Sequence, residues 1–348
     1  MQWIFWYDWI LMPVYFFLLV KIFFSFAKKR YNGKIYKYFR YGFLAKMTGA
    51  LGFAFYHQYI YGGGDTFLFF DTGLKIADFA TSDFHRFAAL VFKPVESTVD
   101  YHFDSLDEIV FAEANFFVPR VTAILSFITF RSYLSICLLF SAISFGGIWY
   151  AYSSLLKIYP AFEKEFAMAF LFIPSVILWG SGLGKDSITL GCTCLVFGSL
   201  LRLFLIPKQS LFKNLILLSI GFFVVILVKP YIIYSFSLSF AIGILFQRIA
   251  NMKNKGLKVF MAIMLVMGSL AATFVGYGYM ISDPNFGLDL VSEKVIALNK
   301  NLGTQSGAGS AYDLGLDVSS VNSFTDIIPV FPKSIFVTLF RPFLWEIS

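Results

Sequence analysis

Two short glycine-rich sequences carry the charged residues of this chain that are best suited to chemistry. The first, Tyr61-Gly62-Gly63-Gly64-Asp65-Thr66, follows an apolar stretch, and its glycines allow the backbone to turn sharply beside a ligand. Asp65, with Asp71 as a second candidate, has the chemistry of a general base or of a ligand for a divalent metal. The structural alternative is that the glycines end a helix and the carboxylates are simply solvated.

The second sequence, Trp179-Gly180-Ser181-Gly182-Leu183-Gly184-Lys185-Asp186-Ser187, joins two apolar stretches with almost no polar length. Its spacing approaches that of a nucleotide-binding P-loop. However, Trp179 stands where the first glycine is required, and Asp186 stands where Ser or Thr is required, which disfavours a nucleotide site. Backbone amides beside Lys185 can still hold a phosphate oxygen. The alternative is a structural ion pair between Lys185 and Asp186 at a helix boundary.

Two further cations interrupt apolar sequence. Lys229 lies in Val228-Lys229-Pro230-Tyr231, and Arg341 lies in Leu339-Phe340-Arg341-Pro342-Phe343-Leu344-Trp345-Glu346. A cation that faces lipid costs a few kcal/mol, so each should reach the membrane surface or a polar cavity. Each alone is typical of an interfacial anchor. Together with Lys185 and Asp186 they predict a phosphate-binding site, because arginine can bind phosphate through two hydrogen bonds.

The composition indicates which kind of protein positions these residues. Of 348 residues, 58% are hydrophobic and 14% are charged, whereas an ordinary globular domain carries about 25% charged residues. A soluble fold of this length has too much surface to bury so much apolar mass. The net charge of +7 sits in short runs between apolar stretches, where it indicates topology and no nucleic-acid partner. The sequence therefore predicts a polytopic helical membrane protein.

Eight stretches approach the roughly 20 apolar residues that a membrane-spanning helix needs. They are residues 9–27, 43–61, 132–152, 166–184, 187–206, 212–228, 231–247 and 259–281. Residues 115–130 are apolar but contain Pro119 and Arg120, which predicts a re-entrant or interfacial helix instead. The expected fold is an all-α bundle of about eight spans, in a single integral-membrane domain over residues 1–348.

Basic connections set the expected orientation. Residues 28–40 and 248–258 are rich in Lys and Arg and should lie in the cytoplasm. An external N-terminus followed by eight spans then places two long loops, 62–117 and 282–333, outside. The glycine-rich turns and Lys229 reach the same external face. Within the second loop, residues 301–310 should be mobile, as a lid or a simple tether.

Cysteines and histidines add no site of their own. Cys192 and Cys194 lie two apart in an apolar stretch and point to different sides of a helix, which suits neither a disulfide nor a metal site. The three histidines lack metal-ligand spacing. A divalent metal at Asp65 is accordingly the one cofactor that stays open.

In combination, the motifs G-G-D (63–65), S-G-x-x-K-D-S (181–187), K-P (229–230) and R-P-F-L-W-E (341–346) resemble a group of bacterial polytopic proteins. Genes for these proteins occur with those for exopolysaccharide and O-antigen assembly. The group is similar to the GT-C glycosyltransferases and to oligosaccharide repeat-unit polymerases. The resemblance implies a GT-C-like protein of the bacterial inner membrane that uses a polyprenyl-phosphate-linked sugar at the external face, beside other envelope-biosynthesis proteins. GT-C enzymes place an acidic residue in the first large external loop, which implies Asp65 first and Asp71 second.

Three functions stay open from the sequence. In a transferase or polymerase, Asp65 would deprotonate the acceptor or hold a metal, while Lys185, Lys229 and Arg341 stabilise the departing phosphate. A transporter or flippase of an anionic or lipid-linked substrate predicts mid-membrane charges, broken helices and an internal repeat. The sequence shows no repeat, and its charges gather at one face. A non-catalytic assembly subunit would bind partners through the external loops. The transferase is the favoured hypothesis.

Overall fold

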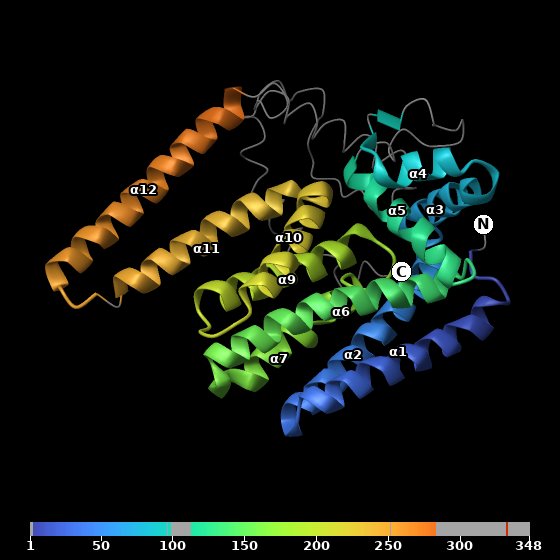
Figure 1. The fold of residues 1–348 in the computed structure, drawn as a ribbon, viewed down its shortest axis with the longest axis horizontal. Coiled ribbons are helices and arrows are strands. Elements are labelled where there is room, and N and C mark those ends of the chain that lie inside the picture. The colour runs from blue at the N-terminus through green and yellow to red at the C-terminus, as the bar shows by residue number, and fades with distance from the viewer. Residues whose placement is uncertain (1–2, 96, 99–112, 251, 283–331, 333–348) are drawn as a thin grey trace. The chain divides into compact units, whose positions relative to one another are not determined.

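A computed structural model describes residues 3–95, 97–98, 113–250, 252–282 and 332, and within them the chain is all-α (Figure 1). By compactness the chain divides into two units, Met1–Leu238 and Ser239–Ser348, and the sites described below lie in the first. The helices, in order, are α1 (Asp8–Arg30), α2 (Gly33–Phe55), the π-helix η1 (Tyr56–Tyr61), α3 (Asp65–Ser82), α4 (Phe84–Phe92), α5 (Glu113–Ile128), α6 (Tyr133–Ile158), the 3-10 helix η4 (Pro160–Phe162), α7 (Glu163–Leu171), α8 (Pro174–Leu178), α9 (Lys185–Phe204), α10 (Leu211–Val228), α11 (Pro230–Ala250) and α12 (Lys255–Ser282).

Five helices of the described residues are long and apolar enough to cross a membrane, namely α1, α6, α9, α10 and α11. Their outward-facing side chains agree with a lipid environment, because Phe17 and Ile22 on α1 and Phe223 on α10 are exposed. These apolar helices make the chain a multi-pass membrane protein. The expectation of about eight spans is not shown.

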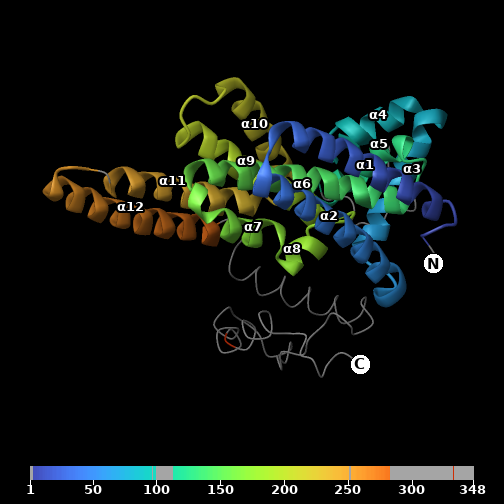
Figure 2. The ribbon, with the colours of Figure 1, turned by 90° about the horizontal axis from the view of Figure 1, so that it is seen from below.

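One predicted span is not a single helix. Residues 166–184 do not form one helix, since α7 ends at Leu171 and α8 covers only Pro174–Leu178 (Figure 2). Pro174 has no amide proton to donate, and it disfavours the helical conformation in Ile173, whose backbone is extended at φ −68° and ψ 124°. The segment is therefore a broken helix that returns the chain from the end of α6 to the start of α9.

The remaining apolar stretches also form helices. Residues 43–61 fall in α2 and η1, and residues 259–281 fall in α12, but neither α2 nor α12 is among the five candidate spans of the described residues. The stretch 115–130 forms the 16-residue α5, which contains Pro119, and its re-entrant or interfacial position stays a prediction. The first long loop, 62–117, contains α3 and α4. The second, 282–333, lies outside the described residues apart from its first residue and Pro332.

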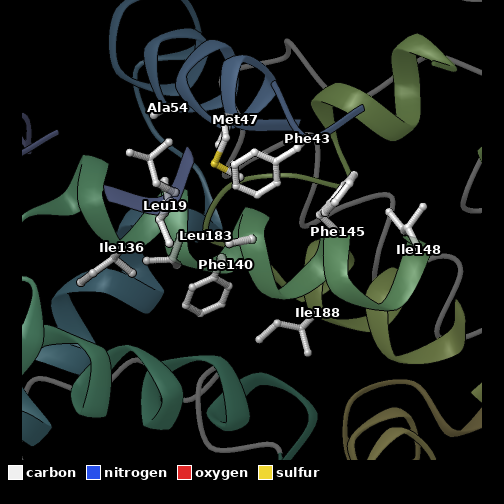
Figure 3. Packing of buried hydrophobic residues seen from close by; sticks show 14 of the residues in the cluster. Leu19, Phe43, Met47, Ala54, Ile136, Phe140, Phe145, Ile148, Leu183 and Ile188 are labelled. Carbon is white, nitrogen blue, oxygen red and sulfur yellow. The ribbon is translucent and has the colours of Figure 1, made fainter. Parts of the chain in front are cut away.

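Helix α6 forms the centre of the first unit. It packs against α1, α2 and α9, and Figure 1 shows α1, α2 and α6 side by side. Phe43 of α2 packs edge-on against Phe145 of α6 with ring centroids 5.2 Å apart, and Met47 lies beside Phe43 in this core (Figure 3). Long aromatic and aliphatic side chains thus fill the space between α2 and α6.

Small residues bring α6 and α9 close together. A Cβ added to Gly147 would lie 1.8 Å from the carbonyl oxygen of Gly191, so the two backbones touch. Later on both helices, a Cβ on Gly198 would lie 2.7 Å from the Tyr150 ring, and the Arg202 Nε donates to Ser154 Oγ. The helices therefore run parallel, and both begin at the same end of the bundle.

That end, here called the Asp8 end, is defined by a buried carboxylate. Asp8 is fully buried and accepts hydrogen bonds from Ser132 Oγ (2.6 Å) and the Leu134 amide (3.2 Å) at the start of α6. A negative charge there stabilises the helix N-terminus. At the opposite end, here called the Arg30 end, Tyr31 packs edge-on against Trp149 with ring centroids 5.2 Å apart.

Candidate functional site

The glycine run ends a π-helix and starts α3. Gly62 is left-handed with φ 70°, and Gly64 has φ 111°, conformations that glycine adopts without strain. Asp65 is the first residue of α3, where the helix dipole favours a negative charge. Its carboxylate is exposed and interacts electrostatically with the His57 ring. The glycines thus separate the end of η1 from the start of α3, as the structural alternative expected, and the Asp65 carboxylate is accessible to solvent.

Asp71 has a structural role. Its Oδ2 accepts a hydrogen bond from the Trp3 indole Nε1 at 2.9 Å, and Trp3 stacks on Phe67 with ring centroids 4.0 Å apart. The Trp3 amide also donates to Gln58 Oε1 at 3.0 Å. These contacts fix the start of the chain against α3. Asp65 is therefore the better candidate for a base.

The loop between α8 and α9, residues 179–184, is held from inside by Lys46. This lysine of α2 is 1% exposed, and its Nζ donates to the carbonyl oxygens of Val176 (3.2 Å) and Gly180. Ser144 Oγ also donates to the Gly180 carbonyl, at 3.0 Å. A broken helix leaves carbonyls without intrahelical donors, and a buried lysine supplies them here. The sequence reasoning missed Lys46, although a lysine inside an apolar stretch was an available signal.

The loop delivers Lys185 and Asp186 to the first turn of α9, where they take different partners. Lys185 Nζ donates to Asn115 Oδ1 of α5 at 2.7 Å and lies 5.7 Å from the centre of the Phe69 ring of α3. Asp186 forms an ion pair with Lys229, the residue between α10 and α11. The ion pair therefore joins Asp186 to a lysine from a distant segment, and not to its neighbour in the sequence, Lys185.

A cavity of about 340 Å³ lies beside this ion pair. Thr189 and Thr193 of α9 line it, and their hydroxyl oxygens are buried and have no hydrogen-bond partner within the described residues. A buried unpaired hydroxyl costs free energy that a ligand oxygen would recover. The cavity is lined by residues of α8, the following loop, α9 and the start of α11, namely Ser175, Val176, Trp179, Gly180, Asp186, Thr189, Leu190, Thr193, Lys229 and Ile232.

Trp179 connects this cavity with the Asp65 region. Its indole is 48% exposed and meets the His57 ring edge-on, with centroids 6.1 Å apart. Trp179 thus lies between the cavity, whose wall it shares with the ion pair, and His57, whose ring Asp65 influences electrostatically. From the sequence, His57 is set aside with the other histidines because it lacks metal-ligand spacing, and no other pattern links it to Asp65 or Trp179. The π-helix that carries His57 is a form often found at functional sites.

Other predicted site residues are not placed. Arg341 lies outside the described residues, as do residues 301–310, which were predicted to be mobile. In the described part of the chain no group of three or more His, Cys, Asp or Glu residues could hold a metal ion. A metal role for Asp65 thus has no set of partner ligands there.

No family model, no curated protein and no solved structure matches this chain. The resemblance to GT-C-like proteins therefore rests on the short motifs, and the chain is a helical protein with several apolar helices that can span a membrane.

Proposed function

We propose that this protein is a membrane glycosyltransferase or polysaccharide polymerase that binds a polyprenyl-phosphate-linked sugar at the Asp8 end of the bundle, on the external face of a bacterial inner membrane. One observation carries the proposal. The cavity beside Trp179 combines a displaceable ion pair with two threonines whose hydroxyls lack partners among the described residues, and Trp179 on its wall contacts the ring of His57, on the side of the exposed Asp65.

The ion pair is suited to exchange its anion. The Asp186 side chain is 64% exposed and that of Lys229 is 25% exposed, so water screens the pair. Exposed ion pairs contribute about 0–1 kcal/mol. A phosphate that adds charge-assisted hydrogen bonds competes well against such a partner. Lys229 would therefore turn from Asp186 to the phosphate of the donor.

The remaining groups have complementary roles in this proposal. The Thr189 and Thr193 hydroxyls donate to oxygens of the phosphate or sugar, and the exposed face of Trp179 packs against the sugar ring. Asp65 takes the proton of the acceptor hydroxyl as that oxygen bonds to the anomeric carbon. The bond between the anomeric carbon and the phosphate oxygen breaks at the same time. Lys229, with Lys185 nearby on α9, stabilises the charge on the departing polyprenyl phosphate.

Purified protein in lipid nanodiscs tests the proposal with a panel of radiolabelled undecaprenyl-phosphate-linked sugars, where release of undecaprenyl phosphate reports transfer. Asp65→Asn should lower transfer by about 10²- to 10⁴-fold, because it keeps the volume and removes the base. Asp78→Asn is the matched control, since Asp78 is also exposed on α3 but pairs with Arg131. Equal transfer by the two variants would contradict a base at position 65.

A second function, transport of an anionic or lipid-linked substrate, is favoured by the broken α7–α8 segment and the buried Lys46 beside it. Transporters commonly bind substrates where helices are discontinuous. Proteoliposomes that contain a fluorescent prenyl phosphate and no acceptor separate the two functions. Translocation that Lys46→Met abolishes supports transport, and absence of translocation supports the transferase.

A further inference from the structure

A second cavity, of about 180 Å³, lies at the Arg30 end of the bundle and takes no part in the proposed function. Arg30, Arg202 and Lys213 line it together with aromatic side chains of α1, α2 and α6. We call it the Arg202 cavity. Cations on the connections of a membrane protein ordinarily indicate sidedness, but Arg202 lies within a candidate spanning helix and is only 8% exposed. Its position therefore needs another explanation.

Arg202 is held in a fixed orientation by neutral groups. Its Nε donates to Ser154 Oγ at 2.7 Å, and its Nη2 donates to Ser153 Oγ at 2.8 Å. The guanidinium lies 3.7 Å from the centre of the Tyr150 ring. Hydroxyls and an aromatic face orient the positive charge without neutralising it. A guanidinium has five N–H donors, so several remain for a ligand.

Further positive charge gathers at the same place. Lys157 Nζ donates to Gln209 Oε1 at 3.1 Å, and its ammonium is repelled by Arg202, Arg30 and Lys213. Within the part of the chain that the structure describes, no carboxylate pairs with any of these four cations. Unpaired cations beside a membrane are costly, so a bound anion would stabilise the cluster.

Trp149 adds a specific donor to this cavity. Its ring is 5% exposed, and its Nε1 is buried with no hydrogen-bond partner among the described residues. Tryptophan N–H groups usually find a partner when buried. An oxygen of a ligand in the cavity would supply it. The opposite wall is apolar, with Phe23 and Phe145 inside and Phe26, which is 53% exposed, at the lipid-facing side of α1.

We propose that the Arg202 cavity binds the phosphate of an anionic phospholipid, with Arg202, Lys213 and Arg30 on the phosphate, the Trp149 N–H on a phosphate or glycerol oxygen, and an acyl chain along the aromatic wall. The apolar wall is the reason to assign a lipid in preference to free phosphate. Basic pockets between membrane helices are typical sites for such head groups. The proposal is independent of the transferase function, because the two cavities share no lining residue.

Binding is measured on the purified full-length protein by native mass spectrometry, with phosphatidylglycerol and phosphatidylcholine of identical acyl chains. Arg202→Gln and Lys213→Gln should each weaken phosphatidylglycerol binding about fivefold. Lys213 is exposed, so Lys213→Gln should still fold and can test lipid binding even if Arg202→Gln does not fold. Trp149→Phe keeps the ring and removes only the N–H, and it should also weaken binding. Lys28→Gln is the matched control, because Lys28 is an exposed cation close to Arg30 that does not line the cavity.

Preferential retention of phosphatidylglycerol by the wild type and by Lys28→Gln, with its loss in the cavity variants, supports the proposal. Equal retention in the cavity variants and the control overturns it. Inorganic phosphate provides a second arm. If it displaces phosphatidylglycerol at millimolar concentration, the site takes a free anion and the assignment to a lipid is wrong.

Discussion

Lys229 and Asp186 form an ion pair that joins the start of α9 to the junction of α10 and α11. The pair borders a cavity whose Thr189 and Thr193 hydroxyls lack partners in the described residues. A buried hydroxyl without a partner disfavours a purely structural account of this region. The pair and the hydroxyls are together explained by an anionic ligand that bonds to Lys229.

Neutralising the two members of the pair should have opposite effects on ligand binding. Asp186→Asn removes the competing anion and should strengthen binding of farnesyl phosphate, whereas Lys229→Gln removes the cation and should weaken it. Both variants should change thermal stability little, because an exposed pair contributes at most about 1 kcal/mol. Equilibrium binding in nanodiscs and thermal unfolding measure these effects. Weaker binding in both variants would indicate that the pair only shapes the loop.

Removing the buried lysine, Lys46, should loosen the loop that carries Trp179. Lys46→Met removes the donor to Val176 and one of two donors to Gly180, at a cost of about 1–3 kcal/mol for unsatisfied buried carbonyls. A cysteine probe at Ser181, which is 1% exposed, should then react faster with a maleimide. Lys164→Met, at an exposed lysine, is the control. Equal labelling rates in the two backgrounds would mean that Lys46 does not hold the loop.

Adjacent glycines of α6 provide a test of the α6–α9 contact. Gly147→Ala places a methyl group against the Gly191 backbone, so the helices must separate and stability should fall by about 1–3 kcal/mol. Gly146→Ala meets open space and should be neutral or stabilise the helix by up to about 1 kcal/mol. Thermal unfolding of the two variants in the same detergent compares them. A similar melting temperature for both would contradict the close parallel packing.

Much of the fold follows from hydropathy and length. The stretches 9–27, 132–152 and 187–206 agree with α1, α6 and α9 to within six residues at each end, because each is strongly apolar over its length. Averaged hydropathy failed over 166–184, where apolar content is sufficient but a single residue, Pro174, ends the helix. The local backbone chemistry of proline, not the composition, decides that segment.

The candidate site could be predicted only in outline. Counting basic connections assigned Asp65, Lys185, Asp186 and Lys229 to one face, and the structure pairs two of them. Their partners could not be predicted, because Lys229–Asp186 and Lys185–Asn115 join segments that are distant in sequence. Such pairs depend on how the helices pack against one another, and neither the spacing of residues nor the composition predicts that packing.

The central claim is that the donor binds in the cavity beside Trp179, and photo-crosslinking tests it most directly. The probe is a prenyl-phosphate-linked sugar that carries a diazirine. Mass spectrometry should locate the adduct between Trp179 and Thr193. Thr189→Val, which removes an unpartnered hydroxyl at nearly constant volume, should lower the yield about fivefold while thermal stability is kept or raised. An adduct located elsewhere, or an unchanged yield in Thr189→Val, would contradict the account.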